Sequence, residues 1–110
     1  MEIKELNYLI AIAEEKSISK AADRLYMAQS SLSQFLQTLE SSLDSKLFVR
    51  TSRGVRLTEA GTIMLKYAYA TLAEYHRTQD KIQDLKKRKR HSWDQRFSRF
   101  LPAASGTQRI

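Results

Sequence analysis

Apolar positions recur with a helical period through the first part of the chain. In residues 3–15 they fall on one side of a helix, at Ile3, Leu6, Leu9, Ile10 and Ala13, while the glutamates of this segment lie at other positions. This 3.6-residue period is typical of an amphipathic helix. The next segment interrupts the pattern, and Ser17 or Ser19 suits the N-cap of a short second helix over roughly residues 19–25. Two adjacent alanines in that short helix predict close packing against another helix.

A third helix is predicted after a turn at residues 26–28, and its two faces differ in character. The apolar face recurs at i, i+3, i+4, i+7 and i+11 and consists of Leu32, Phe35, Leu36, Leu39 and Leu43. The opposite face has hydrogen-bonding groups but no charge and consists of Ser30, Ser33, Gln34, Gln37 and Ser41. A face that only keeps a helix soluble normally carries Lys and Glu, so this composition is unusual.

A change of period over residues 47–57 predicts a short β-hairpin. Two short apolar runs flank the segment 50–54, in which Gly54 supplies a positive φ. The region is cationic and has no acid between its four charges, which are Lys46, Arg50, Arg53 and Arg56.

A long helix is predicted from residue 58 to about residue 88, roughly 45 Å at 1.5 Å per residue. Thr58 suits its N-cap, and Glu59 suits the positive end of the helix dipole. Spacings of three and four, typical of a coiled-coil seam, relate Leu65, Ala68, Leu72, Tyr75, Gln79 and Ile82. A single small domain does not need a helix of this length. We therefore expect a partner chain at this seam, with dimerisation through Leu65, Ala68, Leu72 and Ile82. Residues 89–110 are predicted to form a basic, flexible tail.

Composition limits the chain to one soluble intracellular domain. Its 110 residues include 3 Gly, 1 Pro and 0 Cys, which favours a mainly helical protein without disulfides. No run reaches the ~18–20 apolar residues of a membrane span, and the first residues lack a secretory pattern. We therefore expect a cytoplasmic protein.

The net charge of +7 favours a polyanionic partner, nucleic acid first and an anionic membrane surface second. Residues 1–85, however, hold 11 Lys+Arg and 11 Asp+Glu, so the whole net charge comes from residues 86–110. Positive potential in the predicted folded part is local, around the hairpin.

Two short helices, a polar-faced third helix, a hairpin and a further helix follow the order of a winged helix-turn-helix. In such a domain the third helix enters the major groove, which is about 12 Å wide. Gln29 and Gln34 can pair with adenine, and Ser30 and Ser33 can reach bases or phosphates. Arg50 and Arg53, which lie in the predicted hairpin, would contact the backbone or the minor groove. The same pattern also suits an exposed polar helix on a small helical bundle.

Specific runs of residues favour the first interpretation. They are Ala21-Ala22-Asp23-Arg24-Leu25, Gln29, Leu32-Ser33, Leu39-Glu40, Leu47-Phe48-Val49-Arg50-Thr51 and Arg53-Gly54-Val55-Arg56-Leu57-Thr58-Glu59-Ala60-Gly61. With these runs the chain resembles the N-terminal domain of LysR-type transcriptional regulators over about three quarters of its length.

The resemblance implies a bacterial transcription factor that binds a partly palindromic DNA operator as a homodimer or a higher oligomer. It also implies DNA contacts from Gln29, Ser30, Ser33 and Gln34 and from Arg50 and Arg53.

The chain departs from the family pattern around its third helix. The family usually has Ser and Pro on either side of the glutamine, where this chain has Ala28 and Ser30, so an N-cap and a rigid first turn are lost. An Arg is common at the position of Gln34, so base preference shifts toward adenine or affinity falls.

A second departure concerns the end of the chain. The family normally continues into an effector-binding domain, whereas the resemblance here stops near Leu85. We therefore expect no effector pocket in this chain.

We also expect no catalysis, no cofactor, no metal and no membrane partner. Ser17-Ile18-Ser19-Lys20 fits an acyl-enzyme pattern that occurs by chance, and His76 and His91 are far apart without a cysteine partner. The alternative function is that of a truncated interaction protein, which dimerises with full-length relatives and interferes with their assembly.

Overall fold

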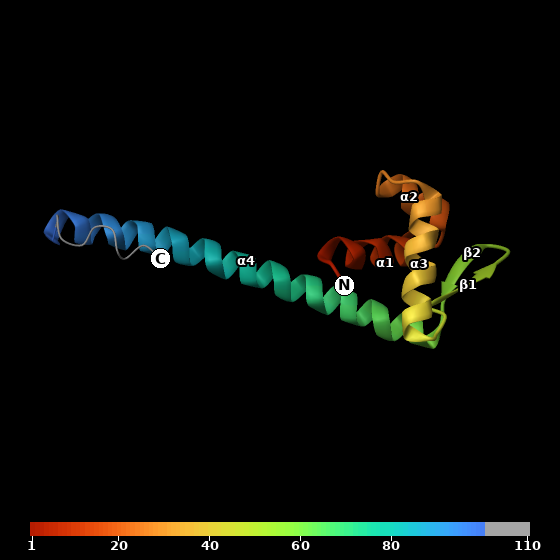
Figure 1. Ribbon diagram of the computed structural model, residues 1–110. Coiled ribbons are helices and arrows are strands. Elements are labelled where there is room, and N and C mark those ends of the chain that lie inside the picture. The colour runs from red at the N-terminus through yellow and green to blue at the C-terminus, as the bar shows by residue number, and fades with distance from the viewer. Residues whose placement is uncertain (101–110) are drawn as a thin grey trace. The chain divides into compact units, whose positions relative to one another are not determined.

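The computed structural model describes the backbone of residues 1–100 and the side chains of residues 1–88. The elements, in chain order, are α1 (Ile3–Glu15), α2 (Ile18–Arg24), α3 (Gln29–Leu43), β1 (Phe48–Thr51), β2 (Gly54–Leu57) and α4 (Glu59–Phe100) (Figure 1). This order confirms the predicted class, a mainly helical winged helix-turn-helix followed by a long helix. The chain divides into two units, Met1–Ala73 and Glu74–Ile110.

The main core of the first unit lies where the first three helices meet the hairpin. Its buried side chains are Leu9, Ala11, Ile12, Ile18, Ala21, Ala22, Leu32, Leu36, Leu47, Phe48 and Val55. The alanines of α2 are 0% and 1% exposed, which confirms the predicted close packing. The ring of Phe35 on α3 meets Tyr8 of α1 edge to face, with centroids 5.2 Å apart. The expectation that Leu43 faces inward is wrong: it is the last residue of α3 and is 44% exposed.

Local hydrogen bonds determine where α2 begins and ends. The Ser17 hydroxyl accepts from the Lys20 backbone N–H at 3.1 Å, so Ser17 rather than Ser19 is the N-cap. At the other end, the N–H of Met27 donates to the carbonyl of Ala22 at 3.0 Å, and Tyr26 adopts a φ of 56°. This arrangement is a Schellman motif, which satisfies carbonyls at the end of a helix.

The hairpin is antiparallel and is held against the end of α1. Phe48 pairs with Leu57 and Thr51 pairs with Gly54, which leaves Ser52 and Arg53 as the connecting turn. Gly54 has a φ of 122°, as predicted, and a Cβ there would lie 2.2 Å from the Lys16 carbonyl oxygen. The Val55 N–H donates to that same oxygen at 3.1 Å, so the hairpin backbone lies directly on α1.

The start of α4 is attached to the segment before β1. The Thr58 hydroxyl accepts from the Gly61 N–H at 2.9 Å, which confirms Thr58 as the N-cap, and it donates to the Lys46 carbonyl at 2.6 Å. Gly61 passes so near this segment that a Cβ would lie 2.0 Å from the Leu47 carbonyl oxygen. Further along α4, Ala68 packs against Leu6 and Ile10 of α1.

The helix α4 continues to Phe100, past the end expected near residue 88. The basic block at residues 86–90 was the reason for that expectation, but no Gly or Pro follows Gly61 until Pro102, so nothing in the sequence breaks the helix. The predicted flexible tail began at residue 89, whereas the backbone is helical to Phe100. The side chains of residues 89–110 and the backbone of residues 101–110 lie outside the described residues, and for residues 101–110 the flexible tail stays a prediction. In the second unit, Glu74 and Arg77 form an ion pair. In the part of the chain that the structure describes, no helix has the length and apolar character to cross a membrane.

Candidate nucleic-acid interface

The outer face of α3 presents the predicted polar residues to solvent. Gln29, Ser30 and Gln34 are exposed, and Ser33 is half-buried. They stay outside because Leu32 and Leu36, on the opposite side of the helix, are 0% and 6% exposed in the core. Uncharged donors and acceptors on one helix face are the groups that can pair with base edges in a major groove.

Two details distinguish the individual residues of this face. The Gln34 side-chain amide donates to the Thr38 hydroxyl at 3.4 Å, so it is directed along the helix toward the next turn. Ala28 occupies the N-cap with extended backbone and no side-chain hydrogen bond. The backbone N–H groups of the first turn of α3 therefore receive no side-chain cap, unlike those of α2.

The hairpin presents arginines beside this face. Arg50 and Arg53 are both exposed, and the turn between them is held by Thr51, whose hydroxyl donates to the Gly54 carbonyl and accepts from the Arg53 N–H, both at 3.1 Å. Of the cations at residues 46–56, only Lys46 has an acidic partner among the described residues.

The predicted residues do not all line one surface. A groove of about 330 Å³ between α3 and the hairpin is lined by both Ser33 and Arg50, together with Gln37 and Lys46. Arg53 instead lines a second hollow of about 590 Å³ on the hairpin, with Lys16 and Arg56. Gln29, Ser30 and Gln34 line neither hollow.

Glu40 holds α3 to the hairpin, a role that the sequence analysis did not assign. Its side chain is buried, and one carboxylate oxygen accepts from the N–H groups of Leu47 and Phe48, at 2.7 and 3.2 Å. The other oxygen lies 3.7 Å from the Lys46 ammonium nitrogen. These contacts satisfy a carboxylate that would be costly to bury alone. The available signal was an acidic residue adjoining the apolar stripe of α3.

Tyr26 was also missed as a surface residue. It is 97% exposed and lies in the turn just before α3. A large side chain at a turn without hydrophobic periodicity was the signal in the sequence.

The proposed dimerisation residues lie in different environments. Ala68 is fully buried within the chain, against Leu6 and Ile10 of α1, and Leu65 and Leu72 pack partly on the same cluster. In the second unit, Ile82 is 50% exposed. Three of the four predicted seam positions thus contact α1 of their own chain. Ile63, which the predicted seam omitted, is 67% exposed.

The sequence of the chain is similar to those of known proteins. The model of the family "bacterial regulatory helix-turn-helix protein, lysR family" matches residues 3–62. The HTH-type transcriptional regulator YkuM of Bacillus subtilis is 38% identical over 85 residues, which cover 77% of this chain and 29% of the relative. The regulator ShiR of Corynebacterium glutamicum is 51% identical over 73 residues, which cover 66% of this chain and 25% of ShiR. The chain thus spans between a quarter and a third of the length of these two relatives.

Solved structures resemble the first part of the chain. The structure of the CbnR_DBD-DNA complex has a TM-score of 0.71 and 35% identity, and the match covers 77% of this chain and 98% of that one. The BenM_DBD complex with benA site 1 DNA has a TM-score of 0.72 and 36% identity, with coverages of 77% and 99%.

Proposed function

The chain belongs to the lysR family of bacterial regulatory helix-turn-helix proteins, and from this premise we propose that it binds operator DNA as a dimer to regulate transcription. The observation that carries the proposal is the groove shared by Ser33 of α3 and Arg50 of the hairpin. It combines an uncharged hydrogen-bonding helix face with a cation that has no acidic partner among the described residues. These groups complement a DNA duplex, in which base edges offer hydrogen-bonding partners and phosphates attract cations.

Each side chain has a role that fits its chemistry. Gln29, Ser30, Ser33 and Gln34 contact base edges in the major groove, and the two glutamines favour adenine. Arg50 and Arg53 contact phosphates or the minor groove on either side of the hairpin. No reaction is catalysed, and no metal or cofactor takes part.

The dimer forms through α4. Leu65 and Leu72 keep part of their surface exposed, and Ile82 is half-exposed, so each can contact a second chain. Ala68 acts indirectly, because its burial on α1 supports the helix that carries the others. Ile63 adds an exposed apolar side chain near the start of α4. Two copies related by a twofold axis would recognise a partly palindromic operator in the bacterial cytoplasm.

Selection of bound sequences from random DNA by the purified chain tests the proposal. We expect a partly palindromic consensus with adenines in each half-site, and binding at least 100-fold tighter than to random DNA at ~0.15 M salt. No affinity above the non-specific level would overturn it. A chain that dimerises with full-length relatives without binding DNA would support the interaction protein instead.

Ser33→Ala and Ser41→Ala form a matched pair on α3. Ser33 lines the groove beside the hairpin, whereas Ser41 is exposed two turns further along the helix. Ser33→Ala should weaken operator binding about 5- to 150-fold and leave the dimer intact, because one specific contact is worth roughly 1–3 kcal/mol. Ser41→Ala should bind as the wild type does. Equal effects of the two substitutions on operator binding would show that Ser33 makes no specific contact with DNA.

A further inference from the structure

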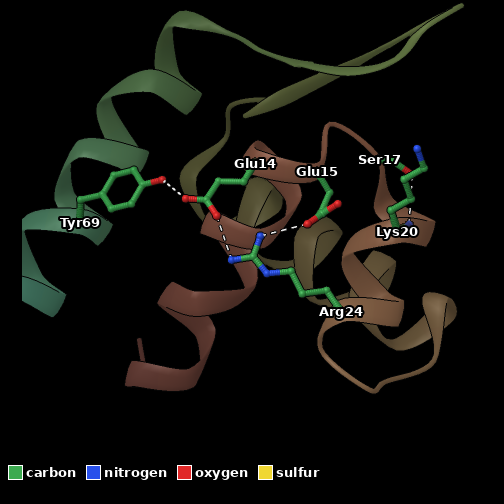
Figure 2. A network of polar contacts seen from close by, with 6 residues as sticks. All are labelled: Glu14, Glu15, Ser17, Lys20, Arg24 and Tyr69. Atoms are coloured by element: carbon green, nitrogen blue, oxygen red, sulfur yellow. Dashed lines mark hydrogen bonds and ion pairs between the residues drawn. The ribbon is translucent and has the colours of Figure 1, made fainter.

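A polar network joins three helices of the first unit, α1, α2 and α4 (Figure 2). The Tyr69 hydroxyl of α4 donates to one carboxylate oxygen of Glu14 on α1, at 2.6 Å. The Arg24 guanidinium of α2 lies 2.8 Å from the other oxygen of Glu14 and 3.2 Å from Glu15. Both oxygens of Glu14 therefore have partners, one from α4 and one from α2.

The chemistry of the network favours the charged form of Glu14. The Tyr69 hydroxyl, and after it the Arg24 guanidinium, hold the pKa of Glu14 below its ordinary value. In return, the carboxylate raises the pKa of Tyr69. Hydrogen bonds to an ionised acceptor are shorter and stronger than neutral ones. Because Tyr69 is 44% exposed, however, solvent screens the contact and its effect on overall stability is small.

The contact matters because the rest of the packing between α4 and α1 is not directional. Ala68 meets Leu6 and Ile10 in an apolar cluster, and apolar burial depends on area rather than on angle. A small side chain such as that of Ala68 also lets one helix turn on the other. A hydrogen bond from the next residue, Tyr69, weakens steeply when its angle changes. The two contacts together fix the rotation of α4 on α1.

We propose that Tyr69 is a positioning residue that fixes the angle between the start of α4 and the DNA-contacting helices, and that it thereby sets the half-site spacing accepted by the dimer. This inference rests on the proposed function, in which α4 joins the two copies. A change of about 10° at the start of a helix moves a point ~20 Å along it by ~3.5 Å, about one base-pair rise. Loss of the hydroxyl should therefore be visible as tolerance of altered spacing.

The test uses the whole chain and the half-site obtained from DNA selection, placed in duplexes whose spacing is changed one base pair at a time. We expect the wild type to prefer one spacing over its neighbours at least tenfold. Tyr69→Phe removes only the hydroxyl and should reduce that preference to less than threefold. Its affinity for a single half-site and its helical circular dichroism should stay unchanged. If Tyr69 had a merely structural role, Tyr69→Phe would lower the half-site affinity and the helical circular dichroism and leave the spacing preference intact.

Two further variants serve as controls. Tyr67→Phe removes the hydroxyl of another exposed tyrosine of α4, for which no hydrogen bond is seen among the described residues, and should keep the wild-type preference. Glu14→Gln keeps an oxygen that can accept from Tyr69 and should retain most of the preference, whereas Glu14→Ala should lose it. Tyr69→Phe with wild-type spacing preference would overturn the inference and leave the proposed function standing. A wild type without specific binding would overturn both.

Discussion

In the described part of the chain, three residues other than glycine occupy left-handed backbone at the ends of helices. Lys16, Tyr26 and Asp44 follow α1, α2 and α3, with φ of 56°, 56° and 53°. This conformation costs an L-residue roughly 1–2 kcal/mol, and glycine usually takes such positions. Because Tyr26 is 97% exposed, packing of its ring does little to offset the cost. The turn before α3, the helix proposed to contact DNA, is therefore strained at Tyr26.

Replacement of Tyr26 measures this strain. Tyr26→Gly should raise the free energy of unfolding by about 0.5–1 kcal/mol, the relief of strain less the entropy that glycine loses on folding. Asp44→Gly should give a smaller gain, because Asp tolerates the left-handed region better than Tyr does. Urea denaturation followed by circular dichroism measures both changes. A Tyr26→Gly variant no more stable than the wild type would show that the tyrosine has a compensating contact.

At the scale of elements, the position of the hairpin beside α3 depends on Glu40. Glu40→Ala leaves the N–H groups of Leu47 and Phe48 without their acceptor. It should lower the free energy of unfolding by about 2–3 kcal/mol, since buried unpaired donors cost roughly 1–3 kcal/mol. Glu40→Gln keeps one acceptor oxygen and should cost less. Urea denaturation at pH 7 compares the three proteins, and an alanine variant as stable as the wild type would show that other contacts hold the hairpin.

Elements with a local signal were predictable from the sequence. The period of α3, the serine before α2 and the glycine in the hairpin act within a few residues. Each was confirmed, down to the Ser17 N-cap and the positive φ of Gly54. The end of α4 differs from the prediction, because Lys and Arg are good helix formers and the run of cations near residue 88 does not end the helix.

Contacts between distant segments were not predictable in this way. Tyr69 and Glu14 are 55 positions apart, and no periodicity relates them. The spacing of Ala68 fits a coiled-coil seam as well as it fits packing on α1, because both require an apolar stripe along the helix. Only the three-dimensional arrangement shows that Ala68 is covered by its own chain. Likewise, candidate residues for DNA contact could be named from the pattern of α3, but not which of them share a groove with the hairpin.

At the scale of the whole molecule, charge is distributed unevenly along the chain. The net charge of +7 comes from residues 86–110, while the residues before them sum to zero. The hairpin cations can contribute a few localised phosphate contacts, whereas the exposed cations Lys86, Lys87 and Arg88 of α4 can contact phosphates of any sequence. The hairpin cations should therefore affect the preference for operator DNA over random DNA, and the basic block should affect the affinity for both DNAs.

Salt dependence separates the two groups of cations. Arg50→Ala should weaken operator binding and reduce the slope of log affinity against log salt by about 1, because one phosphate contact is lost.

The triple variant Lys86→Gln, Lys87→Gln, Arg88→Gln should reduce the slope by up to about 2–3. It should also lower affinity for operator and random DNA by the same factor, so that their ratio is kept. Lys66→Gln, a change at an exposed cation of α4, serves as the control and should alter neither slope nor ratio. Titrations of both DNAs from ~0.05 to ~0.3 M salt give these quantities. If the triple variant instead lost the preference for operator DNA while binding random DNA as before, the basic block would take part in sequence recognition, and the division of roles argued from the charge distribution would be wrong.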